Sequence, residues 1–219
     1  EGDAVACLQV VFAADWFCVI NENLTGGKYF PLFSENPGVP VQISASGPDS
    51  DWENIGQVLF AAIANSRQKV YIATPYLMPP QSLTTALKTA ALSNVDVKII
   101  IPRKSDSIIT KWSSFSYVEE LLEAGVKVYL FEDGFIHSKY MMVDNLFSSL
   151  GTANFDFRSI ETNFEVNAFI YDKRFSLKLE KHFLQDMKMC EEIKYVKWKE
   201  RPWHFKFREA LAHIVSPLL

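Results

Sequence analysis

Runs rich in β-branched residues alternate with amphipathic stretches through most of this 219-residue chain. Short apolar runs predict strands, and apolar residues spaced three and four apart predict helices. In the first part of this alternation, strands are predicted at residues 41–45, 70–74, 95–101 and 126–131, and helices at 50–66, 83–92 and 112–124. Strands that alternate with helices predict an α/β fold with a partly parallel sheet.

Short polar signals mark the ends of several elements. Ser50 and Glu53 form a capping-box pattern at a helix start, and Gly125 predicts a left-handed helix cap. Asp144 and Asn145 predict a tight turn between two strands, which would form an antiparallel hairpin. The other predicted elements are a helix at 3–21, a Gly- and Pro-rich loop at 21–40, strands at 135–143, 147–150 and 164–170, and a helix at 173–190.

Composition limits the class of protein. Apolar residues make up 48% of the chain and charged residues 22%, which is typical of a folded globular protein. The net charge of −4 gives no case for a nucleic-acid binder. Unbroken apolar runs reach about five residues, whereas a membrane-spanning helix needs about twenty, so we expect no transmembrane segment. The start, Glu1-Gly2-Asp3, is unlike a signal peptide.

The segment FIHSKYMMVDNLFSSLGTANFDFRS, at residues 135–159, carries the most chemistry. His137 and Lys139 lie two apart on a predicted strand, so we expect both side chains on one face. Asn154 follows the returning strand and can approach them, and Gly151 permits a close backbone approach. A histidine, an ammonium and a carboxamide that converge on one pocket favour a phosphate ligand and nucleophilic or acid/base chemistry.

These residues resemble the HxKxxxxD(x)6GSxN signature of the phospholipase D superfamily, with Thr152 where the common pattern has Ser. Thr retains the hydroxyl. Flanking segments are similar to bacterial cardiolipin synthases, namely TPYLMPP (74–80), KIIIPRKSDS (98–107), ELLEAGVKVYLFEDGFIHSK (120–139), NFEVNAFIYD (163–172) and FREALAHIVSPLL (207–219). This resemblance covers essentially the whole chain and implies a phospholipase D-like mixed β-sheet flanked by α-helices on both faces.

Members of that family carry two such motifs, whereas this chain has one. The pattern L-x-x-x-F-x-x-D occurs at residues 8–15 and again at 179–186. With the resemblance, this repeat implies a C-terminal half, preceded by a missing half that carries the first motif and membrane helices in a bacterial cell membrane. The implied division is 1–40 as tail helix and linker of a first phospholipase D-like domain, 41–193 as the second catalytic domain, and 194–219 as a basic aromatic segment with a terminal helix.

In the family, one motif's histidine attacks phosphorus to form a phosphohistidine, and the other's protonates the leaving alcohol and activates the incoming one. The resemblance implies that His137 is either the nucleophile or the acid/base partner. Lys139 and Asn154 would hold phosphate oxygens, with help from the Thr152 hydroxyl, and no metal or cofactor would be needed.

Two carboxylates complete the candidate catalytic set. Asp144 lies in the motif, and we expect it to organise the turn rather than touch the substrate. Glu165 follows on the next predicted strand, where it could accept a hydrogen bond from Nδ1 of His137 and fix its tautomer.

The implied reaction is transphosphatidylation of two phosphatidylglycerol molecules to cardiolipin and glycerol. The implied partners are phosphatidylglycerol, membrane lipid, and the missing half or a second copy of the chain, without nucleic acid. Two alternatives stay open: a single-motif phosphodiesterase or nuclease that acts as a homodimer, and a non-enzymatic fragment that binds membrane or a partner.

The C-terminal region and the cysteines carry weaker signals. Residues 194–208 contain six Lys and Arg against Glu200 alone, interleaved with Trp and Phe. This pattern favours either an anionic membrane surface or aromatic packing on the core. Cys7, Cys18 and Cys190 form no CxxC pair, which predicts thiols and no zinc site.

Overall fold

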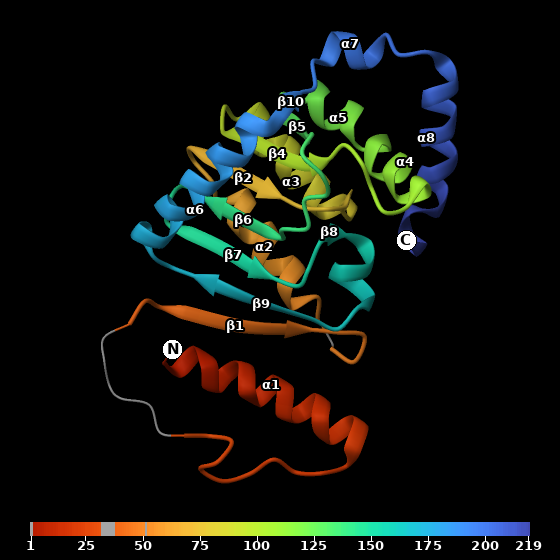
Figure 1. The fold of residues 1–219 in the computed structure, drawn as a ribbon. Coiled ribbons are helices and arrows are strands. Elements are labelled where there is room, and N and C mark those ends of the chain that lie inside the picture. Colours follow the sequence, from red (N-terminus) through yellow and green to blue (C-terminus); the bar gives the residue numbers. More distant parts are fainter. Residues whose placement is uncertain (1, 32–37, 51) are drawn as a thin grey trace.

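The computed structural model describes residues 2–31, 38–50 and 52–219. Its main feature is an eight-stranded sheet in the order β1-β9-β7-β6-β2-β4-β5-β10, beside a small pair, β3 and β8 (Figure 1). The strands are β1 Val41–Ser46, β2 Lys69–Ala73, β3 Leu77–Met78, β4 Asp96–Pro102, β5 Lys127–Phe131, β6 Tyr140–Val143, β7 Phe147–Gly151, β8 Phe155–Asp156, β9 Glu165–Ile170 and β10 Cys190–Glu192. The helices are α1 Asp3–Ile20, α2 Asn54–Ala64, α3 Gln81–Leu92, α4 Ile108–Ser116, α5 Val118–Glu123, α6 Lys173–Asp186, α7 Tyr195–Lys199 and α8 Trp203–Val215.

The sheet is mixed, as predicted. β2, β4 and β5 are parallel neighbours, because helices connect them in sequence. The remaining pairings within the eight-stranded sheet are antiparallel, including the β6–β7 hairpin, whereas β3 and β8 pair in parallel. Asp144 and Asn145 both have positive φ, 53° and 55°, in the turn of that hairpin.

Alternate residues of β2 show how the two faces of the sheet are covered. Val70 and Ile72 are buried with the side chains of α2, α3 and α5, whereas Tyr71 and Ala73 are buried against α6. The prediction of helices on both faces is therefore confirmed, and Figure 1 shows α6 on one face of the sheet and α2 and α3 on the other.

Several predicted boundaries were wrong. The predicted helix at 112–124 is two helices that meet at Tyr117, followed as predicted by Gly125 at φ +93°. The capping box does not form, because α2 begins at Asn54 with Glu53 at its N-cap and without a side-chain cap bond. The predicted helix at 173–190 ends its α-helical part at Asp186, and the short strand β10 that follows was not predicted.

The predicted strand at 135–143 is regular only from Tyr140. β2 ends at Ala73, which pairs with Tyr140, and the chain then turns toward Pro75. Residues 135–139 consequently have no partner strand on that side, so His137 and Lys139 precede the strand instead of lying on it.

α1 lies along the β1 edge of the sheet (Figure 1), and none of its residues is buried. Among the described residues, it alone has the length and apolar composition that a membrane crossing requires, a criterion that core helices of soluble proteins and signal sequences also meet. Gln9 and Asp15 interrupt its apolar residues, so no unbroken apolar run in it exceeds five residues.

Candidate functional site

The centre of the candidate site is the pair His137 and Lys139. Lys139 Nζ lies 3.1 Å from Nε2 of His137 and donates to its carbonyl oxygen at 3.0 Å. An ammonium has only donors, so Nε2 accepts from it when that nitrogen carries no proton. Although the segment is irregular, the two side chains meet on one side as the sequence predicted. The Phe135 ring, 5.5 Å away between centroids, packs beside the imidazole.

Lys139 occupies a partly buried position. It lines a small cavity with Thr74, Ser149 and Asn167. Burial lowers the pKa of Lys139 below its ordinary value, against the opposing effect of the negative charges of Glu165 and Asp156. The ammonium is therefore less solvated than a surface lysine, which strengthens its interaction with an incoming anion.

The strand β7 brings the second half of the motif back to this pair. Its last residue, Gly151, leaves no space for a side chain, because a Cβ there would collide with Asn167 Oδ1 and the Val166 carbonyl oxygen. The expected close backbone approach at Gly151 is thus present. This close approach places Thr152 beside Val166, whose backbone amide donates to Thr152 Oγ1 at 2.9 Å.

Asn154 is held by a carboxylate that the sequence analysis did not single out. Its Nδ2 donates to Asp156 at 3.0 Å, and Asp156 also accepts from the Ser159 amide at 2.7 Å. Burial raises the pKa of Asp156, while the hydrogen bonds from Ser159 and Asn154 oppose the rise. Asn154 Oδ1 is buried and has no hydrogen-bond partner in the described part of the chain.

Asn167 and Thr74 are two further residues that sequence reasoning missed. Asn167 donates to Ser149 Oγ at 3.0 Å and accepts from the Ala153 amide at 3.2 Å. Thr74 accepts from the Phe155 amide at 3.1 Å. Both side chains fix the segment that carries Thr152 and Asn154. The sequence carried one signal for them: Thr74 directly follows the apolar strand β2, and Asn167 is a polar residue within the strand β9.

Glu165 lies at the start of β9, and its negative charge raises the pKa of Lys139 against the lowering effect of burial. Its carboxylate accepts from Asn163 Nδ2 at 3.4 Å, and within the described ranges no hydrogen bond joins it to His137. The predicted carboxylate–imidazole contact is absent from this arrangement.

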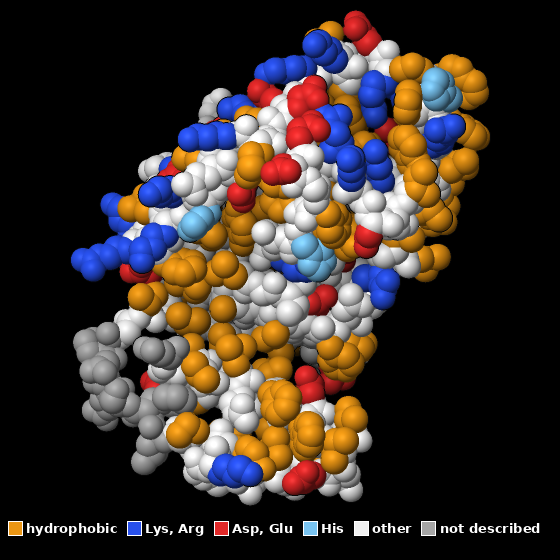
Figure 2. All heavy atoms as spheres, viewed as in Figure 1, with side chains coloured by type: hydrophobic (Ala, Val, Ile, Leu, Met, Phe, Trp, Pro, Cys, Tyr) orange, Lys and Arg blue, Asp and Glu red, His pale blue; other side chains and the backbone are white. Residues whose placement is uncertain are grey.

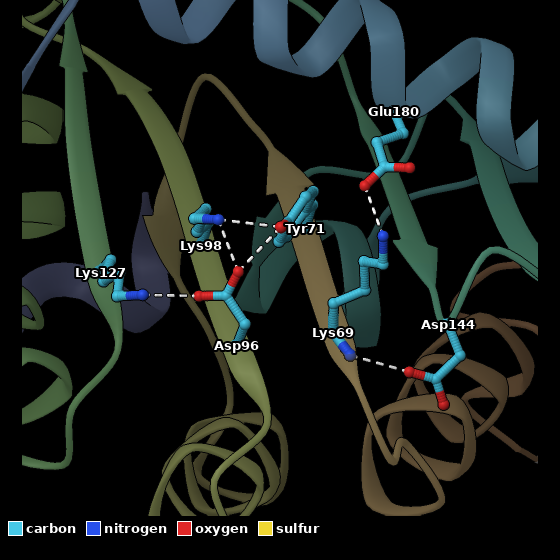
Figure 3. A network of polar contacts seen from close by, with 7 residues as sticks. All are labelled: Lys69, Tyr71, Asp96, Lys98, Lys127, Asp144 and Glu180. Carbon is cyan, nitrogen blue, oxygen red and sulfur yellow. Dashed lines mark hydrogen bonds and ion pairs between the residues drawn. The ribbon is translucent and has the colours of Figure 1, made fainter.

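Asp144 lies at the far end of β6 from His137. Its carboxylate accepts from the backbone amides of Arg67, Gln68 and Lys69, each at 2.8 Å. Figure 3 shows the bond to Lys69, whose ammonium pairs with Glu180 at 2.5 Å. The geometry assigns Asp144 to joining the hairpin turn to the start of β2, in agreement with the expectation that it organises the turn.

The imidazole of His137 therefore meets the partly desolvated ammonium of Lys139, and the Gly151 amide donates to the Lys139 carbonyl oxygen at 3.4 Å just before the segment that carries Asn154. An imidazole beside an ammonium can bind an anionic phosphate and transfer a group or a proton. Across the described ranges, no group of three or more His, Cys, Asp or Glu side chains is arranged to hold a metal ion.

Comparisons with known proteins agree with the motif. Residues 59–187 match the family described as cardiolipin synthase, PLD-like domain. The chain is 43% identical over its whole length to the cardiolipin synthase of Geobacillus thermodenitrificans and 40% identical to cardiolipin synthase 2 of Staphylococcus epidermidis. It spans 44% and 45% of the length of these relatives.

Solved structures share the fold. Phosphatidylserine synthase of Haemophilus influenzae superposes with a TM-score of 0.64 at 18% identity, over 82% of this chain and 48% of that one. The phospholipase D family member Nuc of Salmonella typhimurium superposes with a TM-score of 0.60 at 19% identity, over 72% of this chain and 99% of that one. Because the family match covers residues 59–187 and the identity to these relatives extends over the whole chain, the chain belongs to the cardiolipin synthase family of phospholipase D-like proteins.

Proposed function

We propose that this chain supplies one half of the active site of a cardiolipin synthase. The proposed reaction transfers the phosphatidyl group of one phosphatidylglycerol to the terminal glycerol hydroxyl of a second, giving cardiolipin and free glycerol. The observation that carries the proposal is the placement of Lys139 Nζ at 3.1 Å from Nε2 of His137. The identity to curated cardiolipin synthases over the full chain supports the choice of substrate.

The proposed chemistry has two steps. A histidine nitrogen forms a bond to phosphorus while the phosphorus–oxygen bond to the leaving glycerol breaks, and that oxygen takes up a proton. The hydroxyl of the second lipid then loses its proton and attacks phosphorus, and the nitrogen–phosphorus bond breaks. His137 performs one of two roles in this sequence, nucleophile or acid/base, and the first half of the protein supplies the other histidine.

The other polar groups have defined parts in this proposal. Lys139 neutralises a phosphate oxygen, and Asn154 supplies amide hydrogens from a side chain that Asp156 orients. Thr152 positions the loop through Val166 and can donate its hydroxyl hydrogen to phosphate. Glu165 offsets the positive charge that develops on the histidine and the lysine.

We further propose that residues 1–40 complete a first domain of the same fold, that 41–193 form the second catalytic domain, and that 194–219 form a C-terminal appendage. The repeated pattern supports this division. On α6, Leu179 and Phe183 are buried against the sheet, whereas their counterparts on α1, Leu8 and Phe12, are 43% and 51% exposed. At these positions α1 thus exposes the residue types that α6 buries against its sheet. We also place the whole enzyme at the bacterial cell membrane, where its substrate resides.

The proposal can be tested with phosphatidylglycerol vesicles, a chelator and mass spectrometry of the lipid products. This chain and a chain extended to include the first motif would be compared. Cardiolipin from the extended chain is the expected result. Failure of both chains to form cardiolipin would overturn the proposed function.

A second candidate, a single-motif phosphodiesterase formed by two copies, rests on one observation. The match to Nuc covers 99% of that chain, so one domain of this fold can be an entire protein. This candidate predicts hydrolysis of a simple phosphodiester by the short chain alone, with activity that rises with the square of concentration when the chain is dilute.

A further inference from the structure

The last helix presents an exposed apolar stripe along its outer side. The stripe consists of Trp203, Phe207, Leu211, Ile214 and Leu218. Their exposed fractions are 75%, 56%, 51%, 74% and 79%. Spacings of three and four residues place them on one side of α8 and of the short turn that continues it. Figure 2 shows hydrophobic side chains gathered along the edge of the molecule where Figure 1 places α8.

The opposite side of α8 is already occupied by the protein core. Ala212 and Ser216 are buried, and Ser216 Oγ lies 2.7 Å from the Tyr117 hydroxyl. Phe205 packs on Trp112 with ring centroids 5.8 Å apart. The helix is therefore fixed on α4, and the stripe must point away from the domain.

A largely buried ion pair fixes the start of this helix. The Nη1 and Nη2 atoms of Arg201 donate to the Glu209 carboxylate, at 2.6 and 2.8 Å. The guanidinium also stacks on the Trp198 ring at 3.3 Å from its centroid. These contacts hold α8 in one orientation before it meets a partner. Docking of the stripe would therefore cost little conformational entropy.

Positive charge lies next to the stripe. From residue 194 to the end, six Lys and Arg face two Glu. Arg201 and Lys206 are paired with Glu209 and Glu119, but no carboxylate of the described part forms an ion pair with Lys197, Lys199 or Arg208. Figure 2 shows Lys and Arg side chains beside the hydrophobic patch.

We propose that the stripe inserts into the interfacial layer of an anionic lipid bilayer, with Lys197, Lys199 and Arg208 against the headgroups. An apolar helical side with Trp at one end and unpaired cations beside it is the chemistry of an interfacial helix. The choice of a lipid surface over a protein partner rests on the proposed function, whose substrate is an anionic phospholipid.

The location of α8 makes this contact useful for that function. The loop before α4 carries Asp106, which accepts from the Tyr76 hydroxyl at 2.7 Å. Tyr76 packs on Phe135, two residues before His137. These contacts connect the helix α4, on which α8 packs, with the candidate site, so that membrane contact of α8 would orient the site toward the lipids.

The test uses a local probe, because exposed α1 could also bind vesicles. In a variant with Cys7, Cys18 and Cys190 replaced by Ser, a spin label is attached at Ile214→Cys, and at Leu146→Cys as a control on a distant exposed turn. Accessibility to oxygen and to a water-soluble nickel complex is measured with phosphatidylglycerol vesicles and with phosphatidylcholine vesicles. We expect the label at position 214 to gain oxygen accessibility and lose nickel accessibility with the anionic vesicles, while the control label stays aqueous.

Substitutions give a second measurement. Phe207→Ser with Leu211→Ser and Ile214→Ser should lower partitioning into phosphatidylglycerol vesicles at least about tenfold, since three large apolar side chains lose their burial. Leu92→Ser, at an exposed site on α3, is the matched control. Each of Lys197→Gln, Lys199→Gln and Arg208→Gln should lower partitioning about fivefold at low salt.

A label at 214 that stays aqueous while the chain binds vesicles would overturn the proposal. So would a label that is shielded without lipid, because a second copy or another part of the protein would then cover the stripe. Neither readout requires turnover. Docking can therefore be confirmed even if the protein makes no cardiolipin, and the two proposals fail separately.

Discussion

Lys139 Nζ lies 3.1 Å from Nε2 of His137 and donates to the carbonyl oxygen of the same residue. In the proposed reaction, this ammonium lies beside the imidazole nitrogen that would attack phosphorus or transfer a proton. When a phosphate binds, the ammonium can move its hydrogen bond from Nε2 to a phosphate oxygen. The Nε2 lone pair is then available for attack or proton transfer.

Lys139→Met should reduce cardiolipin synthesis by the two-motif protein about 10²- to 10³-fold, because a charge that stabilises the transition state is lost. The stability of the fold should change little, since within the described part of the chain the ammonium bonds only to His137. Initial rates by mass spectrometry and urea unfolding measure the two effects. Lys181→Met, on the exposed side of α6, is the matched control. A rate within about twofold of wild type would remove Lys139 from the transition state.

Glu165→Gln should lower turnover at least about tenfold while leaving the fold intact. The negative charge of Glu165 raises the pKa of Lys139 against the lowering effect of burial. Without that charge, the pKa of Lys139 falls further, and the ammonium is lost at a lower pH. The alkaline limb of the kcat/KM profile should therefore move to lower pH. An unmoved limb with unchanged turnover would exclude Glu165 from the mechanism.

Asp144→Ala should destabilise the domain by about 2–4 kcal/mol, because three backbone amides lose a charged acceptor. Asp144→Asn retains one acceptor oxygen and should cost less. The free energy of unfolding in urea provides the measurement. Equal stability of the Ala variant and the wild type would contradict the structural role assigned to this carboxylate.

Asp96 should give the protein a specific loss of stability in acid. Burial favours its neutral form, but hydrogen bonds from Lys127, Lys98 and Tyr71 outweigh burial and lower its pKa to about 2 (Figure 3). A carboxyl whose pKa is lower in the folded state stabilises the fold above its unfolded pKa, and this contribution disappears as pH falls from about 4 to about 2. We expect about 1–2 kcal/mol after allowance for solvent screening.

The urea midpoint of wild type and of Asp96→Asn, followed across that pH range, checks this expectation. The variant should be less stable at neutral pH and should show a shallower decline. Parallel curves for the two proteins would contradict the assignment.

The sequence predicted the mixed sheet, both helical layers and the approach of His137 and Lys139. Local periodicity predicted the mixed sheet and motif spacing predicted the approach of the two residues, whereas the helices on both faces were implied by the family resemblance. The sequence did not predict that the strand expected at 135–143 would begin only at Tyr140. That start depends on where its partner β2 ends, far away in the chain. Asp156 and Asn167 were missed for a related reason: their roles come from bonds to Asn154 and to the Ala153 amide that only the folded chain reveals.

The central claim is that His137 acts in cardiolipin formation, and a matched pair of histidine variants tests it most directly. In the two-motif protein with phosphatidylglycerol vesicles, His137→Ala should lower the rate of cardiolipin formation at least about 10³-fold, because the nucleophile or its acid/base partner is removed. His182→Ala, at an exposed position on α6, should leave the rate unchanged. Cardiolipin formation by His137→Ala at the wild-type rate would contradict the account.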